Sequence, residues 1–286
     1  MDSKVEFLFL NEEDMIKAGV LDADRAVDTI GEVITLLSEG DYLMGGRAHN
    51  DHGVQLIFPE KSDIPNFPLA DSADRRFMAM PAYLGGRFHM CGEKWYGSNG
   101  RNSHKGLPRS ILMATLNDVE TGQPLAYMSA NLLSAMRTGA MPGLTAMYLA
   151  RKDSRVLTIL GAGVIGRTSL MAIMAKFPDL EVLKIKGSSK TSHTAHELAD
   201  YARENYKSLK EIIICDTLEE AVRDADIIAE AVSVEPRKWP VIDPAWVKPG
   251  CTIISSYILK KVFSPLSRSI KRTKFLASPA NSGYCT

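Results

Sequence analysis

Residues 156–169 read VLTILGAGVIGRTS, a short apolar run followed by three glycines and a stretch of helical character. Gly161, Gly163 and Gly166 have the spacing G-x-G-x-x-G, which is informative only where a strand precedes it and a helix follows it. The first glycine permits a tight turn, the second lets a pyrophosphate approach the backbone, and the third lets helix and strand pack closely. The helix N-terminus adds N–H groups and positive potential. The motif therefore predicts a dinucleotide site, although a glycine-rich turn without a ligand would show the same letters.

Short apolar runs alternate with amphipathic helices from residue 151 onward, at RVLTIL, EVLKIKG, EIIIC, DIIAEAV and CTIISS. This alternation is typical of βαβ units and predicts a parallel sheet. Before residue 150, helical segments mix with strand-like pieces such as RFMAMPAYL, and NDVETGQ predicts a hairpin turn. NLLSAMRTGAMPGLTAMYLA then has helical spacing with a Gly-Pro interruption. We therefore expect an α/β protein, with a Rossmann-type parallel-sheet domain over residues 151–259 and an α+β domain over residues 1–150.

The end of the second predicted strand of that sheet bears on which dinucleotide binds. NAD sites usually hold an Asp or Glu there for the ribose hydroxyls. This chain has Gly187 at that position, followed by Ser188, Ser189 and Lys190. Two hydroxyls and a lysine suit a 2′-phosphate, so we expect NADP in preference to NAD. If this loop only faces water, the discrimination is slight.

Composition argues against several classes of function. Lys and Arg together number 34, as do Asp and Glu, so the net charge is near zero and nothing predicts a nucleic-acid partner. No apolar run reaches the length of a membrane span, and MDSKVEFLFLNEED lacks the pattern of a signal peptide. We therefore expect a cytoplasmic protein with no membrane partner.

The cysteines and histidines give no pattern of a metal site. His193 and His196 lie three apart on a predicted helix, but no third ligand stands nearby, so we expect a solvated helix face and no metal. The cysteines are scattered without a CxxC pair, which favours free thiols. They are Cys91, Cys215, Cys251 and Cys285.

Several segments before the glycine turn resemble one protein family. They are FMAMPAYL, GEKWYGSN, and KGLPRSILMATLNDVETGQPLAYMSANLLSAMRTGAMPGLTAMYLAR, and TILGAGVIG follows them in the same order. Together they resemble the ornithine cyclodeaminase/μ-crystallin family from about Phe9 to Ser256. The resemblance implies that residues 1–150 bind substrate and form a homodimer, with the substrate between the two domains. It also implies hydride movement at the α-carbon of an amino acid or its imine.

The resemblance assigns roles to individual cations. Arg47 and Lys94 match the family's substrate-binding positions, and an arginine can hold a carboxylate through two parallel N–H bonds. A lysine desolvated beside Arg47 would have a lowered pKa and could move protons. Arg137 matches an arginine beside the cofactor and the reacting atoms, and Arg109 stands where related cyclodeaminases have a threonine. The expected catalytic residues are Lys94 and Arg137. The expected cofactor contacts are Arg109, Arg137, Thr138, Gly161, Gly163, Val164, Ile165, Gly166, Ser188, Ser189, Lys190 and Ser233.

The chain departs from the family after the fifth predicted strand. Cyclodeaminases have an Asp there that handles the substrate amino group, whereas this chain has Leu259 and no carboxylate after Asp243. Residues 260–286 read as an atypical, basic and weakly patterned tail. A divergent enzyme and an altered end would both give this pattern.

Three functions are compatible with the sequence. The first is an ornithine cyclodeaminase, which converts L-ornithine to L-proline and ammonia through internal hydride transfer with bound NAD(P). The second is an NAD(P)H-dependent imine (ketimine) reductase, or an amino-acid or opine-type dehydrogenase, which would consume cofactor. The third is a catalytically impaired NADP-binding protein. The sequence does not define the substrate side chain.

Overall fold

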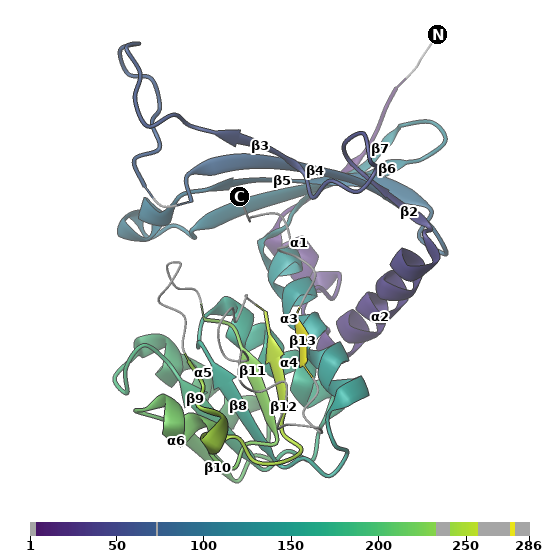
Figure 1. Ribbon diagram of the computed structural model, residues 1–286. Helices are drawn as coiled ribbons and strands as arrows, with labels where there is room; N and C mark the ends of the chain where they lie inside the picture. Colours follow the sequence, from purple (N-terminus) through teal and green to yellow (C-terminus); the bar gives the residue numbers. More distant parts are fainter. Residues whose placement is uncertain (1–3, 73, 233–240, 257–274, 278–286) are drawn as a thin grey trace. The chain divides into compact units, whose positions relative to one another are not determined.

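The computed structural model describes residues 4–72, 74–232, 241–256 and 275–277. The chain divides into two compact units, Met1–Leu21 with Gly31–Ser134, and Asp22–Ile30 with Ala135–Thr286. The first unit is built on a mixed sheet and the second on a parallel sheet, so the predicted fold class is confirmed (Figure 1). The chain passes between the two units after Leu21, Ile30 and Ser134, so most of helix α3 (Asn131–Leu149) belongs to the second unit.

The second unit contains a six-stranded sheet in the order β10-β9-β8-β11-β12-β13, with every neighbouring pair parallel. The strand order reverses between β8 and β11, which is the topological switch point where doubly wound sheets bind ligands. The strands are β8 (Val156–Leu160), β9 (Val182–Lys186), β10 (Glu211–Ile214), β11 (Ile227–Glu230), β12 (Thr252–Ser255) and β13 (Phe275–Ala277). The connecting helices are α4 (Val164–Lys176), α5 (His193–Asn205), α6 (Leu218–Val222) and the 3₁₀ helix η2 (Pro244–Trp246).

Apolar side chains cover both faces of this sheet, which explains the continuous apolar runs in its strands. Leu157 and Ile159 belong to one buried cluster, with residues of α4 and α5. Leu160 and Ile228 belong to a second cluster, with residues of α6. Thr158 is also fully buried, and its hydroxyl donates to the carbonyl of Ala221 in α6 at 2.7 Å.

One strand lies within residues 260–286, whose sequence is weakly patterned. Residues 275–277 form β13 and pair in parallel with β12, with Phe275 opposite Ile253. These three residues therefore have regular structure that the weak sequence pattern did not indicate. The rest of 260–286 lies outside the described residues.

Helix α3 is continuous, so the predicted Gly-Pro interruption is wrong. Pro142 lies inside the helix, and the glycines on either side of it serve the packing against α4. A β-carbon on Gly139 would overlap the backbone of Thr168, and one on Gly143 would lie 2.8 Å from the β-carbon of Ala172. The hydroxyl of Thr168 donates to the carbonyl of Ala135 at 3.0 Å. The two helices can approach this closely because Gly139 and Gly143 have no side chain.

The first unit contains a seven-stranded sheet in the order β1-β7-β6-β5-β4-β2, with β3 also paired to β4. Only β1 and β7 pair in parallel among the described strands of this sheet. The predicted hairpin joins β6 to β7, and Asp118 accepts hydrogen bonds from Thr121 in its turn. The strands are β1 (Leu8–Leu10), β2 (Tyr42–Met44), β3 (Val54–Ile57), β4 (Arg76–Leu84), β5 (Met90–Ser98), β6 (Ser110–Asp118) and β7 (Pro124–Ser129). The helices before and between them are α1 (Glu12–Lys17), α2 (Ala23–Glu39) and the 3₁₀ helix η1 (Gly100–Lys105).

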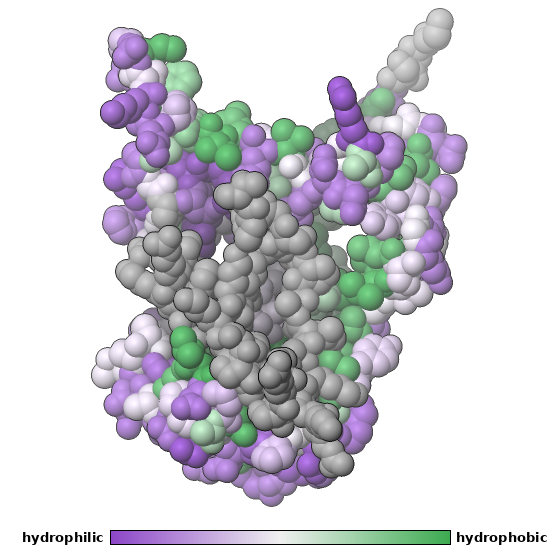
Figure 2. All heavy atoms as spheres, viewed as in Figure 1, coloured by the Kyte–Doolittle hydropathy of each residue, from purple (hydrophilic) through white to green (hydrophobic). Residues whose placement is uncertain are grey.

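The register of β4, β5 and β6 separates the residues of this sheet into two faces. Met78 lies opposite Tyr96, and Tyr96 opposite Leu112, so these three share one face. The alternate residues share the other face, and several of these are exposed and apolar, including Phe77, Trp95 and Ile111. Hydrophobic side chains accordingly reach the surface over this sheet (Figure 2).

Candidate functional site

The glycine turn lies at the carboxyl end of β8 and has the geometry that a dinucleotide cradle needs. Gly161 has φ = +95°, and a β-carbon there would lie 2.7 Å from the carbonyl carbon of Ala231. A β-carbon on Gly166 would overlap the carbonyl oxygen of Gly161. Gly163 differs because nothing lies within 4 Å of its β-carbon position. The turn is therefore closed at its first and third glycines and open at the second, where the motif places the pyrophosphate.

Helix α4 begins directly after this open glycine. Gly163 is its N-cap and forms no side-chain cap hydrogen bond, and the first helical bond runs from the N–H of Arg167 to the carbonyl of Gly163. The first-turn N–H groups of a helix have no intrahelical acceptor and attract anions. Val164 is exposed and Ile165 half-buried, so their backbone lies at the surface of the unit. These residues fit a pyrophosphate group.

The loop after β9 has no carboxylate, as its sequence indicated. A β-carbon on Gly187 would lie 2.9 Å from the hydroxyl of Ser192, so a larger side chain would displace the start of α5. Ser188, Ser189 and Lys190 are all exposed. The carbonyl of Lys190 lies 3.1 Å from Nε2 of His196, which anchors the loop to α5.

Lys94 lies in the middle of β5, on the face of the first sheet that also carries Met78 and Tyr96. Its ammonium group sits 5.1 Å from the centroid of the Tyr96 ring. The guanidinium of Arg76 lies 5.9 Å from the same centroid, and it donates to the Tyr96 hydroxyl at 3.2 Å. Tyr96 thus contacts two cations from neighbouring strands, an arrangement that aromatic rings favour. Arg76 and Lys94 therefore place two cations against one aromatic ring.

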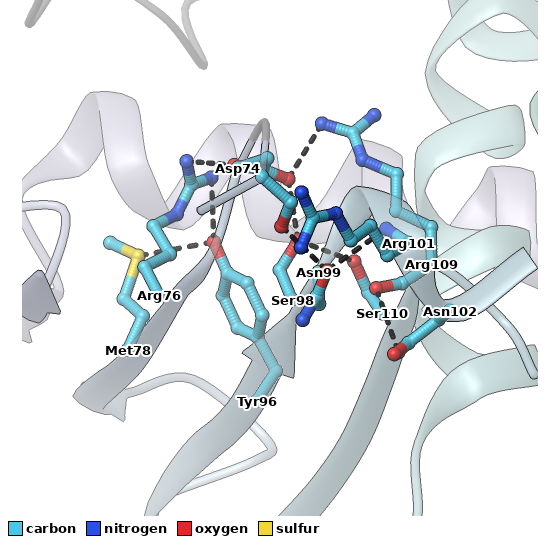
Figure 3. A network of polar contacts seen from close by, with 11 residues as sticks. Asp74, Arg76, Met78, Tyr96, Ser98, Asn99, Arg101, Asn102, Arg109 and Ser110 are labelled. Atoms are coloured by element: carbon cyan, nitrogen blue, oxygen red, sulfur yellow. Dashed lines mark hydrogen bonds and ion pairs between the residues drawn. The ribbon is translucent and has the colours of Figure 1, made fainter. Parts of the chain in front are cut away.

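Asp74 organises the polar network next to this group (Figure 3). It pairs with Arg76, accepts from the guanidinium of Arg109 at 2.6 Å, and accepts from the hydroxyl of Ser98 at 2.5 Å. The Asp74 side chain is largely buried, whereas that of Arg109 is about half exposed. The positive charge that Arg109 brings to this region is therefore partly neutralised by Asp74.

A second carboxylate fixes two more arginines beside this network. Asp71 accepts from Arg75 at 2.6 Å and from Arg101 at 2.9 Å. The hydrogen bond from Arg75 holds the pKa of Asp71 below its ordinary value. Of these two carboxylate networks, sequence reasoning singled out only Arg109, because their members come from loops, strands and η1 and share no motif.

Arg47 lies in the turn between Gly45 and Asp51, where its side chain is exposed. The cation that shares an aromatic contact with Lys94 is Arg76. The alternation in RFMAMPAYL and EKWYGS was the available signal, since Arg76 and Lys94 share a face once β4 and β5 are paired.

Arg137 and Thr138 lie in the first half of α3. Arg137 is exposed and Thr138 half-buried, while the neighbouring Met136 and Gly139 are buried. The start of this helix is tied to β6 by Asn131, whose side chain accepts from the N–H of Leu112 and donates to the carbonyl of Ser110. Ser233 and Leu259 lie outside the described residues.

Within the described ranges, no three His, Cys, Asp or Glu side chains are placed to hold a metal ion. His193 contacts Glu197 at 3.3 Å. Nor does any helix in those ranges have the length and apolar character needed to cross a membrane. Cys91, Cys215 and Cys251 are free thiols, and Cys285 lies outside the described residues.

Residues 22–256 match the profile of the ornithine cyclodeaminase/mu-crystallin family. The chain belongs to this family. The match confirms the resemblance inferred from sequence and extends over most of both compact units.

Two family relatives and one solved structure are similar over most of the chain. An N-((2S)-2-amino-2-carboxyethyl)-L-glutamate dehydrogenase from Staphylococcus aureus is 30% identical over 263 residues, covering 90% of this chain and 72% of that protein. An alanine dehydrogenase from Archaeoglobus fulgidus is 31% identical over 249 residues, covering 87% of this chain and 66% of its own length. The structure of an archaeal alanine dehydrogenase dimer with bound NAD has a TM-score of 0.69 at 29% identity, covering 87% of this chain and 66% of that one.

Proposed function

We propose that this protein is an NAD(P)-dependent enzyme that moves a hydride to or from the α-carbon of an amino acid or its imine. The observation that carries the proposal is the glycine turn, open only at Gly163 and followed by an uncapped helix N-terminus at the switch point of a parallel sheet. The two relatives above are both dehydrogenases of amino acids, and an archaeal relative holds NAD. When bound, the nicotinamide cofactor supplies the hydride acceptor or donor.

Residues of the second unit would hold the cofactor by its phosphates and ribose. The backbone of Gly161, Gly163 and Gly166 would line the pyrophosphate, and the N–H groups of Val164 and Ile165 would donate to it. Ser188, Ser189 and Lys190 would take the adenosine ribose, and the lysine supports a preference for NADP. Arg109, Arg137, Thr138 and Ser233 complete the proposed cofactor contacts.

Lys94 is the proposed anchor of the substrate carboxylate. Its ammonium group is held over the Tyr96 ring in mid-strand, so a bound carboxylate would meet a charge that is already oriented. A lysine that is half-buried in this way can also exchange a proton with a substrate nitrogen. Arg47 is its proposed partner in this binding, and Arg137 is proposed as a catalytic residue beside the cofactor.

Ornithine cyclodeamination is the second candidate, and membership of the family over residues 22–256 favours it. That reaction returns the hydride to a cyclic imine and leaves no net change in cofactor. It would require a group in this chain to handle the substrate amine in place of the Asp that Leu259 replaces.

One incubation separates the candidates. Purified protein is given L-ornithine, and in parallel L-alanine, with catalytic NAD⁺ or NADP⁺, while ammonia, proline and absorbance of the reduced cofactor are followed. A dehydrogenase accumulates reduced cofactor in step with product. Equal amounts of proline and ammonia without lasting absorbance would indicate cyclodeamination. Tight cofactor binding without turnover, tested also with a cyclic imine and NADPH, would indicate a non-catalytic binder.

We also propose that the chain forms a homodimer through the exposed face of the first sheet. Phe77 and Trp95 on this face are stacked with ring centroids 5.7 Å apart, and both remain about 40% exposed. A monomer rarely exposes a contiguous apolar surface of this kind, and a second copy is the simplest partner for it. That an archaeal alanine dehydrogenase of similar structure is a dimer supports dimerisation itself.

A further inference from the structure

A buried carboxylate ends β11, the strand that begins the second half of the parallel sheet. Glu230 is only 3% exposed. Its Oε2 accepts from the Ser255 hydroxyl at 2.7 Å, and its Oε1 accepts from the N–H of Val232 at 2.6 Å. Both oxygens thus act as acceptors, which is the pattern of an ionised carboxylate. Burying a charge is costly, and these two hydrogen bonds offset part of that cost.

Glu230 also borders the glycine turn. It lies opposite Leu160 in the sheet, and Leu160 directly precedes Gly161. The N–H of Ala231 donates to the carbonyl of Leu160 at 2.7 Å. Gly161 packs so closely on the peptide between Ala231 and Val232 that a β-carbon would lie 2.9 Å from the Val232 nitrogen. The carboxylate therefore holds the same peptide against which the turn closes.

Glu230 lies in the half of the sheet that would take the nicotinamide end of a dinucleotide. In a doubly wound sheet, the half that carries the glycine turn takes one nucleotide and the other half takes the second, on either side of the switch point. The turn after β8 belongs to the first half, so β11 begins the half that takes the nicotinamide nucleotide. An oxidised nicotinamide ring carries a positive charge that the reduced ring lacks. A charge in a low-dielectric surrounding acts more strongly than the same charge in water.

We propose that Glu230 is a positioning residue that makes the site favour the oxidised form of the cofactor over the reduced form. This inference rests on the proposed function, because it concerns the same cofactor. Its hydrogen bond to Val232 fixes the wall of the turn, which affects both forms equally. Its negative charge would attract the positively charged oxidised ring and not the neutral reduced ring. The charge would therefore change the ratio of the two dissociation constants, which an experiment can measure.

The test measures dissociation constants for NADP⁺ and NADPH by titration calorimetry, and repeats them with NAD⁺ and NADH. The Glu230→Gln variant keeps the size of the side chain and removes the charge. We expect the ratio of the oxidised to the reduced dissociation constant to rise at least about fivefold. Glu230→Asp, which keeps the charge, should retain most of the wild-type ratio. Ser255→Ala should weaken both forms by a similar factor, because it loses a hydrogen bond and keeps the charge.

Asp226→Asn is the matched control. Asp226 precedes the same strand at its amino end and also accepts backbone hydrogen bonds, from the N–H groups of Arg155 and Val156. Its removal should leave the ratio unchanged, and melting curves confirm that each variant is folded. An unchanged ratio in Glu230→Gln, or an equal change in Asp226→Asn, overturns the inference while leaving cofactor binding intact. Wild-type protein that binds neither form overturns the proposed function and this inference with it.

Discussion

The three glycines of the turn look equivalent in sequence and have different surroundings in the structure. Gly161 has a positive φ and packs on Ala231, Gly166 packs on the carbonyl of Gly161, and Gly163 faces open space at φ −81°. An alanine at position 161 or 166 must therefore displace backbone, whereas an alanine at 163 adopts an ordinary conformation. The motif predicted that all three glycines are important. Only the structure shows that Gly161 and Gly166 are required by the packing of the turn, whereas Gly163 leaves space for a ligand.

Stability measurements on alanine variants test this difference between the three glycines. We expect Gly161→Ala and Gly166→Ala to lower the free energy of unfolding by about 1–3 kcal/mol, through backbone displacement and, at 161, a left-handed φ. Gly163→Ala should leave it unchanged within about 0.5 kcal/mol. Urea denaturation of the three variants measures these differences. Equal losses in all three would contradict the geometry described for the turn.

Asp226 makes the stability of the second unit depend on pH. Burial opposes its ionisation, but the hydrogen bonds from Lys248 and from the N–H groups of Arg155 and Val156 lower its pKa below the ordinary 3.8. A lowered pKa in the native state stabilises the fold above the unfolded pKa, and the contribution is lost as the pH falls through the native value. Wild-type protein should therefore be more stable than Asp226→Asn at pH 7, and the gap should narrow at pH 3. A gap independent of pH would argue against this role.

The described cysteines should differ in reactivity. Burial raises the pKa of Cys215 to about 11 and that of Cys251 to about 12, so neither forms much thiolate at neutral pH. Cys91 is only half-buried in β5. Brief alkylation of native protein at pH 7.5, followed by peptide mass mapping, should label Cys91 well before Cys215 or Cys251. In denatured protein the three should react alike.

Sequence reasoning about single residues succeeded where a local motif fixed the geometry. The turn at 161–166 and the missing carboxylate at Gly187 were both found this way. Arg76 and Asp74 were missed, because their proximity to Lys94 and Arg109 depends on how β4, β5 and β6 pair. The register between paired strands is set by long-range packing and by turns, so it cannot be predicted from the sequence of one strand. The assignment of Arg47 to the substrate site came from the family resemblance alone and stays a prediction.

At the scale of elements, short apolar runs bounded by turns predicted β8 to β12 closely, since a strand buried on both faces has a continuous apolar sequence. The same reasoning failed for β13 and for α3. The apolar run at 275–277 is too short to indicate a strand, and basic residues precede it. In α3, glycine and proline suggested a break, whereas the glycines permit close contact with α4 and the proline is accommodated inside the helix.

The contact between α3 and α4 gives a prediction at this scale. Gly139→Ala should lower the free energy of unfolding by about 1–3 kcal/mol, because its β-carbon would overlap the backbone of Thr168. Tyr148→Ala, on the same helix and at a side chain 73% exposed, is the control and should change stability little. Thermal melting of both variants decides the matter. Equal stability of Gly139→Ala and wild type would mean that the helices tolerate a wider separation.

At the scale of the whole molecule, the exposed apolar face of the first sheet should determine oligomeric state. We expect Trp95→Asp to shift the protein from dimer to monomer in size-exclusion chromatography with light scattering, because a charge at the centre of an apolar interface is left desolvated. Tyr148→Asp places the same charge at an exposed aromatic residue of the second unit and should leave the dimer intact. A wild-type monomer at all concentrations would exclude this interface.

Dinucleotide binding is the first property to measure, because every proposed activity of the second unit depends on it. Titration calorimetry with NADP⁺, NADPH, NAD⁺ and NADH is performed on wild-type protein and on Gly163→Ala, whose fold should be unaffected. We expect the wild type to bind, more tightly for the phosphorylated pair. We expect Gly163→Ala to lose at least about tenfold in affinity, because the new methyl group occupies the open side of the turn. No binding by the wild type, or equal binding by both proteins, would contradict the proposed dinucleotide site.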